Sequence, residues 1–180
     1  MDFLAVKRGG TYLDATVGLG GHSSEIAKRL GAAGHLIGFD KDAAALGKAA
    51  FSLQPSAVRQ GAEGSAASWT GEDPRRSIGS GDWPSVTLMH GSFAEVGERV
   101  APASLDGLLA DLGVSSLQLS DPARGFSFQA EGPLDMRMDP MSGETAEQVV
   151  NHIDERELAD VIYEFGEERR SRRIARAIVR

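Results

Sequence analysis

The sequence predicts an α/β fold in which helices flank a mainly parallel sheet. Three observations support this prediction. Over residues 11–51, short apolar runs alternate with helically periodic stretches, which is a β-α-β-α order. A glycine-rich turn, "VGLGG", joins the first apolar run to the first helical stretch. The chain has 180 residues, 41% hydrophobic and 25% charged, an ordinary composition for one globular domain.

Four apolar runs have the length of buried strands. They span residues 11–15, 35–39, 85–90 and 105–111. Helices are the usual crossovers between parallel strands, so the alternation favours a parallel sheet. Asp14, Asp40 and Asp111 stand at the ends of three of these runs. Ligands of open α/β sheets bind at the carboxyl ends of the strands, so we expect these acids to lie near a ligand.

Helical periodicity predicts six helices. They cover residues 22–30, 42–51, 92–100, 145–152, 154–165 and 167–180. Asp42 is expected to cap the second helix. Two pairs, Thr145 with Gln148 and Asp154 with Glu157, have the spacing of a capping box.

Two segments lack periodicity. Residues 52–84 are rich in Gly, Ser, Pro and charge, and we interpret them as a flexible surface insertion, partly disordered. Residues 112–143 form a long loop, which is usually either functional or disordered. The uncapped helical pattern at the end of the sequence and the open edge of a four-stranded sheet lead us to expect a fragment.

The glycine turn predicts a nucleotide-like cofactor. The dinucleotide fingerprint G-x-G-x-x-G fails, because Ser23 stands where its third glycine would be. Asp14 suits a ligand with a cationic amino-acid moiety, and the start of the next helix suits a carboxylate. Asp40 can accept both hydroxyl groups of a ribose. This set favours S-adenosylmethionine over NAD; the alternatives are an NAD-dependent oxidoreductase and a tight turn without a ligand.

Composition excludes several classes of protein. The net charge of −7 argues against a generally basic nucleic-acid coat, so RNA would have to meet a local patch. The absence of cysteine excludes disulfides and thiolate metal sites, and His22 has no metal-binding partner at ligand spacing. No apolar run approaches the ~20 residues that cross a bilayer, and we expect a cytoplasmic protein without a membrane contact.

One long block carries a resemblance to a known family. "DGLLADLGVSSLQLSDPARGFSFQAEGPLDMRMD" (106–139) closely resembles the RsmH (MraW) family of ribosomal RNA small-subunit methyltransferases, which methylate cytosine N4. "YLDATVGLGGHS" and "YEFGEERRSRRIARAIV" are similar to the same family. The resemblance implies a class I S-adenosylmethionine-dependent methyltransferase fold, with a Rossmann-like doubly wound sheet and a helical insertion.

The resemblance also implies a division of the chain and a set of cofactor residues. Residues 1–112 would form the cofactor-binding core, and residues 113–180 the substrate loop and the start of the helical insertion. The implied cofactor residues are Gly20, Gly21, His22, Asp40, Phe93, Asp111 and Gln118. For Phe93, core packing is an equal alternative. The match covers about the first half of a full-length enzyme, so an inactive cofactor- or RNA-binding remnant is the alternative function.

Catalysis would rest on Asp111, which we expect to orient the target amine, the methionine end of the cofactor, or both. The partner would be small-subunit ribosomal RNA or the assembling small subunit. Phe126 and Phe128 could stack on an exposed base, and Arg124 and Arg137 could hold phosphates. The competing interpretation is structural: the two phenylalanines would anchor the loop, and Asp135 and Asp139 would pair with Arg137.

The last predicted helix carries an arginine stripe. Its members are Arg169, Arg172, Arg173, Arg176 and Arg180. Such a stripe suits an RNA backbone. The alternative is a solvated helix face that pairs with the acidic segment "DERELAD" (154–160).

Overall fold

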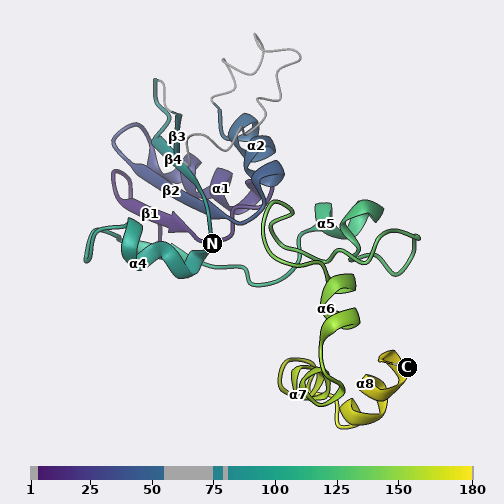
Figure 1. Cartoon of the computed structure of the whole chain (residues 1–180). Helices are drawn as coiled ribbons and strands as arrows, with labels where there is room; N and C mark the ends of the chain where they lie inside the picture. The colour runs from purple at the N-terminus through teal and green to yellow at the C-terminus, as the bar shows by residue number, and fades with distance from the viewer. Residues whose placement is uncertain (1–3, 55–74, 79–80, 180) are drawn as a thin grey trace. The chain divides into compact units, whose positions relative to one another are not determined.

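A five-stranded sheet forms the centre of the first of two compact units, residues 1–117 and 118–180. The computed structural model describes residues 4–54, 75–78 and 81–179. The strand order is β3-β4-β2-β1-β5 (Figure 1). The strands are β1 (Thr11–Asp14), β2 (His35–Asp40), β3 (Arg75–Ile78), β4 (Ser85–His90) and β5 (Gly107–Leu109).

The four predicted strands pair in parallel, which confirms the α/β prediction. β1 lies between β2 and β5, and β2 pairs with β4 on its other side. β3 was not predicted, and it pairs antiparallel with β4. Only one of its four residues is apolar, so its sequence has no strand-like alternation. Its hydrogen-bonded pairing with β4 is what defines it as a strand. Residues 55–74 and 79–80 of the predicted insertion lie outside the described residues.

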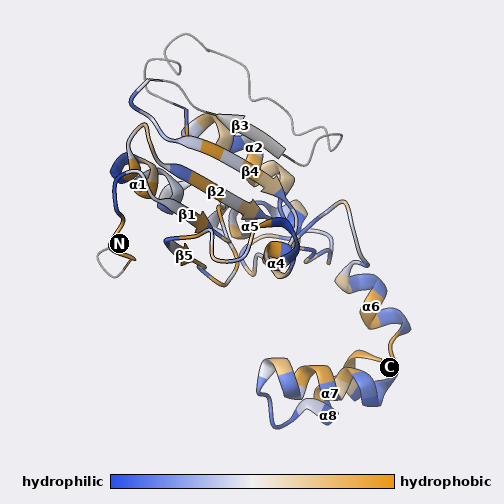
Figure 2. Cartoon of the chain, turned by 90° about the vertical axis from the view of Figure 1, so that its left-hand side faces the viewer, coloured by the Kyte–Doolittle hydropathy of each residue, from blue (hydrophilic) through white to orange (hydrophobic). Residues whose placement is uncertain are grey.

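Helices cover both faces of the sheet, as the doubly wound arrangement requires. α1 (Gly21–Leu30) and α2 (Ala43–Ser52) contribute to the larger core, together with alternate strand residues such as Tyr12, Leu36 and Leu88. The other alternation set, Leu13, Ile37, Phe39 and Met89, forms a second core. The short helix α4 (Val96–Arg99) follows η2 (Phe93–Glu95). Val96, in α4, and Val100, directly after it, pack on that second core. Figure 2 shows the apolar residues along β2 and β4.

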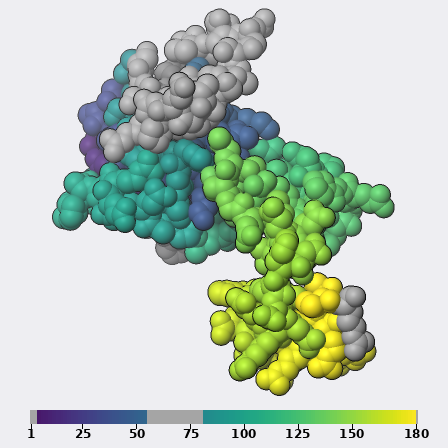
Figure 3. Space-filling view, in the orientation of Figure 1, coloured from purple at the N-terminus to yellow at the C-terminus, as the bar shows by residue number. Residues whose placement is uncertain are grey.

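The second unit is helical. The division between the units falls within α5 (Ser116–Ser120). Beyond it lie η3 (Pro122–Arg124), α6 (Ala146–His152), α7 (Glu155–Gly166) and α8 (Ser171–Ile178). α7 packs against α8 around Leu158, Ala159 and Ala175, and Figure 3 shows the two helices in contact. Within the described part of the chain, no helix is both long and apolar enough to cross a bilayer.

The predicted helix over residues 167–180 starts later than expected. Glu167 adopts a left-handed conformation with φ 52° and ends α7, and α8 begins only at Ser171. A left-handed residue breaks the helical hydrogen-bond pattern, so one periodic stretch becomes a turn and a short helix. Arg169 therefore precedes α8, and Arg180 lies outside the described residues.

Two of the three predicted caps are confirmed. The Asp42 carboxylate accepts the N–H groups of Ala44 and Ala45, at 3.0 and 3.2 Å. Thr145 and Gln148 form the capping box at the start of α6. The Asp154–Glu157 prediction was wrong, because Asp154 is the N-cap of α7 but its side chain makes no cap hydrogen bond. The exposed Asp154 carboxylate is left to water, and α7 already carries glutamates in its first turn.

The buried cap of α2 leads to a first prediction. Replacing Asp42 by Ala should lower the free energy of unfolding by about 1 kcal/mol, because two helix N–H groups lose their acceptor. Asp42→Asn should lose much less, since asparagine is a comparable N-cap. Urea denaturation of the three proteins measures the difference, and equal stability of the alanine and asparagine variants would contradict this role.

Candidate functional site

The acids predicted at the strand ends lie at the same edge of the sheet, where the parallel strands have their carboxyl ends. β1 ends at Asp14, β2 ends at Asp40, and Asp111 follows β5. Backbone hydrogen bonds join the turns at this edge, from Ala15 N–H to the Leu109 carbonyl at 2.8 Å and from Val17 N–H to the Phe39 carbonyl at 3.0 Å. The glycine turn before α1 starts from the same edge.

Asp14 is fully buried and holds the turn from inside. Its side chain is 0% exposed, and its carboxylate accepts the Ser23 hydroxyl at 2.6 Å and the Thr16 N–H at 3.1 Å. Burial raises the pKa of this carboxyl group, and the two hydrogen bonds oppose that shift. Asp14 is therefore a positioning residue that joins β1 to α1. The interpretation of Asp14 as a direct contact for a cationic ligand group was wrong.

Gly20 is required by the geometry of the turn. It is the N-cap of α1 in a left-handed conformation, φ 84° and ψ 17°. A Cβ atom at this position would lie 2.7 Å from Ser52 Oγ, on α2. No side chain caps the start of α1, and a Cβ atom added at Gly21 would meet no other residue within 4 Å. The first N–H groups of α1 are thus able to receive an anionic ligand group.

Asp40 ties the glycine turn to the start of α2. Its two carboxylate oxygens accept the N–H groups of Gly18, at 2.6 Å, and of Asp42, at 2.8 Å. Partial burial raises the pKa of Asp40, and the hydrogen bonds from backbone N–H groups oppose that shift. A carboxylate has about four acceptor positions, so each oxygen retains one for a ligand hydroxyl.

His22 and Asp111 face each other at the exposed side of the turn. His22 Nδ1 lies 3.8 Å from Asp111 Oδ2, and the Asp111 side chain is 71% exposed. The Asp111 N–H donates to Thr16 Oγ1 at 2.7 Å, so its backbone is held while its carboxylate faces solvent. The roles of Thr16 and Ser23 were not predicted from the sequence. The Asp14-x-Thr16 spacing, which forms an Asx turn here, was the available signal for Thr16.

Phe93 is exposed, so the alternative that it packs in the core was wrong. Its side chain is 50% exposed on η2. The turn that leads to it is tied to the same edge of the sheet, because Gly91 N–H donates to the Asp40 carbonyl at 3.0 Å. An exposed ring on this side of β4 can stack on a planar ligand group.

The second unit contains the remaining predicted site residues. Gln118 is buried, and its amide nitrogen donates to Met138 Sδ at 3.9 Å. Arg124 donates through Nη2 to the carbonyls of Arg137 and Met138, at 2.9 and 3.1 Å. Gly125, with φ 72°, allows this closure, because a Cβ atom there would lie 2.5 Å from a neighbouring carbonyl oxygen.

Arg137 forms a two-pronged ion pair with Asp135. Its Nε and Nη2 atoms lie 2.9 and 2.8 Å from the two carboxylate oxygens. Arg137 holds the pKa of Asp135 well below its usual value, at about 2. The contacts of both predicted phosphate-binding arginines thus favour the structural interpretation.

The two predicted base-stacking phenylalanines differ in exposure. Phe126 is half-buried, whereas Phe128 is fully exposed and does not anchor the loop.

The described residues contain no cluster of three or more histidine or acidic side chains that would hold a metal ion. The polar groups at the sheet edge are instead carboxylates, backbone N–H groups and one imidazole. Such groups can form hydrogen bonds with the hydroxyl and carboxylate parts of an organic ligand.

Comparison with known proteins identifies relatives. A sequence model described as the MraW methylase family matches residues 1–64 and 80–180. A ribosomal RNA small subunit methyltransferase H from Koribacter versatilis is 62% identical over 100% of this chain, and one from Acidobacterium capsulatum is 54% identical over 99%. The chain covers 51% and 54% of these two proteins. It therefore spans about half the length of the curated relatives it matches.

The buried Asp14–Ser23 pair leads to a second prediction. Ser23→Ala removes a hydroxyl donor from a buried carboxylate, which should cost about 1–3 kcal/mol of unfolding free energy at neutral pH. Because burial raises the pKa of Asp14, its contribution to stability falls as the pH rises through its titration. The variant lacks the opposing hydrogen bond, so its deficit should grow as Asp14 ionises and shrink at acidic pH.

Urea denaturation of both proteins at acidic and at neutral pH measures this deficit. Ser24→Ala is the matched control, since it removes a hydroxyl from the next residue of α1 without touching Asp14. A deficit that is the same at both pH values would show that the Asp14 carboxylate does not depend on Ser23.

Proposed function

Since this chain belongs to the MraW methylase family, we propose that it is the cofactor-binding portion of an S-adenosylmethionine-dependent RNA methyltransferase. The proposed reaction is methylation of the exocyclic N4 amine of a cytidine in small-subunit ribosomal RNA. The partner would be this RNA or the assembling small subunit, in the cytoplasm. The observation that carries the proposal is the open glycine turn between Asp40 and Asp111.

The residues of the first unit fit the three parts of the cofactor. The N–H groups of Gly21 and His22, at the uncapped start of α1, suit the methionine carboxylate. Asp40 suits the ribose hydroxyls, because its oxygens keep acceptor positions beside their backbone partners. Phe93 suits the adenine ring, and the exposed Asp111 carboxylate suits the cationic amino group.

Several residues of the second unit remain proposals. Gln118 is proposed as a cofactor contact on the resemblance alone, since its amide already bonds to Met138. Phe128 is proposed to stack on an exposed base, because its ring is fully exposed. For Arg124 and Arg137 we propose a supporting role, in which they shape the loop that carries the phenylalanines.

The cofactor supplies a methyl group that is already activated by a positively charged sulfur. The methyl group would pass from the cofactor's sulfur to N4, and the methylated amine would then release one proton to water. The protein mainly has to align the three atoms, and such alignment can provide a large part of the rate enhancement.

Asp111 is the residue we propose for orienting the target amine. Its carboxylate can accept an N–H of the amine and favour the positive charge that develops on nitrogen in the transition state. The hydrogen bond between its backbone and Thr16 fixes where the side chain begins, and His22 faces it at 3.8 Å. The backbone hydrogen bond limits the positions from which the carboxylate can reach a substrate.

A second candidate function is cofactor or RNA binding without turnover. It is favoured by the length of the chain, which covers about half of the relatives. Activity and binding are therefore best measured separately, with cofactor binding on this chain and methyl transfer on a longer protein.

A third prediction concerns the cofactor. Calorimetric titration should detect binding of S-adenosylhomocysteine to this chain, and Asp40→Ala should weaken it roughly tenfold or more, through lost hydrogen bonds to a charged acceptor. Asp106→Ala is the control. The Asp106 carboxylate also accepts a backbone N–H, from Thr11 at 2.8 Å, but at the opposite end of β1.

Equal loss of affinity in both variants would mean that Asp40 acts only through folding. If the folded chain failed to bind S-adenosylhomocysteine, the proposed cofactor site would not form from these residues alone. If it bound the cofactor while a full-length enzyme with this segment transferred no methyl group, the non-catalytic alternative would stand.

A fourth prediction concerns the chemical step. In a full-length enzyme that carries this segment, Asp111→Ala should lower kcat for RNA methylation by roughly 100-fold, because an acceptor for the amine is lost. The fold should survive, since the Asp111 side chain is exposed and Thr16 bonds to its backbone. Single-turnover methyl transfer measures the effect, and unchanged turnover would rule out this role.

A further inference from the structure

A basic groove lies in the second unit, between α7 and the start of α8. Its volume is about 520 Å³. Four arginines line it together with Asp160 and Tyr163 of α7; the arginines are Arg169, Arg170, Arg172 and Arg173. All six of these residues are exposed. The groove therefore combines four positive charges, one negative charge and one aromatic ring.

The fold creates this groove by interrupting the helical pattern. Glu167 ends α7 in a left-handed conformation, and the chain turns before α8 begins at Ser171. Leu158 and Ala175 are buried between the two helices, which directs the polar residues of the turn outward. This turn brings Arg169 and Arg170 next to the first turn of α8. The arginines of the groove therefore include Arg170, which is not part of the predicted helical stripe, and exclude Arg176, which is.

The groove arginines differ in their partners from Arg176, farther along α8. Arg176 Nε lies 3.1 Å from Glu155 Oε1, so part of the predicted stripe does pair with the acidic segment. Within the described ranges, no carboxylate lies within 4.0 Å of the guanidinium groups of the four groove arginines. Their charges are therefore not neutralised by a described ion pair.

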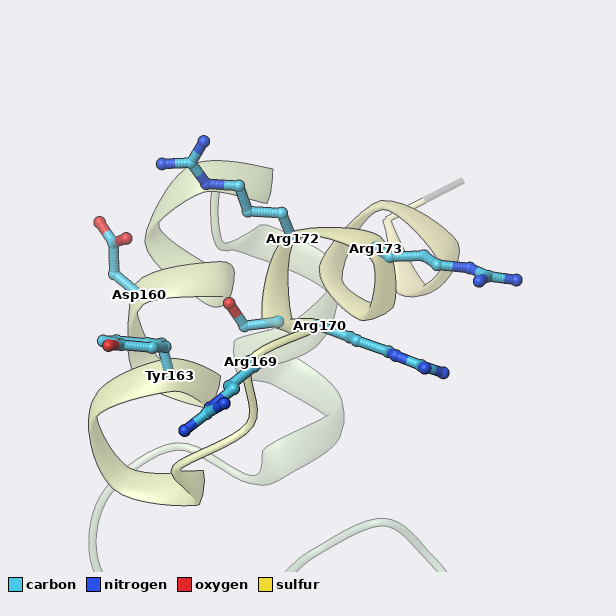
Figure 4. Close-up of a pocket in the computed structure, with 7 residues that line it drawn as sticks. Asp160, Tyr163, Arg169, Arg170, Arg172 and Arg173 are labelled. Carbon is cyan, nitrogen blue, oxygen red and sulfur yellow. The ribbon is translucent and has the colours of Figure 1, made fainter.

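The side chains have a defined arrangement around the groove. In Figure 4, Arg169 and Arg172 extend toward the side of the hairpin that carries Tyr163 and Asp160, whereas Arg170 and Arg173 extend away from it. The Tyr163 side chain is 59% exposed. Tyr163 and the side chains of Arg169 and Arg172 thus lie on one side of the hairpin. An aromatic ring and guanidinium groups are the side-chain types that bind a base and its phosphates.

We propose that this groove binds a single-stranded segment of the RNA substrate. Arg169 and Arg172 hold consecutive phosphate groups, and a base stacks on Tyr163. The proposal rests on the proposed function, because it assumes that the substrate is RNA. It adds a second contact region for that RNA, within the α7–α8 hairpin.

Two features favour a nucleotide over a simple polyanion. An exposed aromatic ring contributes nothing to the binding of phosphate alone but adds stacking for a base. The Asp160 carboxylate repels a bare anion, whereas it can accept a hydrogen bond from a ribose hydroxyl or a base amine. With a net charge of −7 on the chain, attraction for RNA has to be local. Four arginines line this groove, and two of them extend toward its Tyr163 side.

The test is fluorescence anisotropy of a short labelled single-stranded RNA with this chain, over a range of salt concentrations. Arg169→Gln combined with Arg172→Gln should lower the slope of log affinity against log salt by about 0.7 for each lost phosphate contact. The matched control is Arg156→Gln combined with Arg176→Gln, which removes the same charge outside the groove. The control should keep the salt slope of the unmodified chain.

Stacking is tested separately at Tyr163. Tyr163→Ala should weaken RNA binding about fivefold or more, and Tyr163→Phe should retain it, because the ring and not the hydroxyl stacks. Inorganic polyphosphate serves as a competitor without bases. Circular dichroism checks that each variant is folded.

Three results would overturn the proposal: no RNA binding by the folded chain, an equal loss in the charge-matched control, or no effect of Tyr163→Ala. Binding of S-adenosylhomocysteine, measured on the same variants, separates this proposal from the proposed function. If cofactor binding is intact while the groove variants lose RNA, both stand. If groove variants bind RNA normally while cofactor binding persists, only the groove proposal fails.

Discussion

Two carboxyl groups at the ends of neighbouring parallel strands fix the glycine turn of the first unit. Asp14 accepts the Ser23 hydroxyl and the Thr16 N–H, and Asp40 accepts the N–H groups of Gly18 and Asp42. A buried carboxylate is costly unless its oxygens are hydrogen-bonded, so these partners cannot be released without a penalty. Hydrogen bonds from the turn and the start of α1 to Asp14 of β1 and Asp40 of β2 therefore fix the conformation of the glycine turn.

This constraint links packing to the proposed chemistry. Gly20 sits against α2 in a left-handed conformation, which leaves the start of α1 without a side-chain cap. The same turn brings His22 to Asp111, whose backbone is fixed by Thr16. A turn that is preformed in this way loses little conformational freedom when a ligand binds, so more of the binding energy remains for alignment of the reacting atoms.

The second unit uses its charged residues in two different ways. Arg124 and Arg137 are engaged inside the loop by carbonyl groups and by Asp135, so their charge serves the shape of the loop. The arginines of the α7–α8 groove lie at the surface and make no ion pair with a described carboxylate. Proteins bind nucleic-acid phosphates mostly through surface arginines that make no ion pair within the protein. A guanidinium group that is already paired inside the protein has few donors left for a phosphate.

The sequence was sufficient to predict the features that depend on neighbouring residues. Periodicity predicted the four parallel strands, and short-range spacing predicted the caps by Asp42 and Thr145. Tertiary structure decided the use of each polar or aromatic side chain: Asp14 became an internal anchor, Phe93 became exposed, and β3 formed on β4. The reason is physical, since hydrogen bonds and burial between distant residues depend on how strands and helices meet in space, which no local pattern encodes.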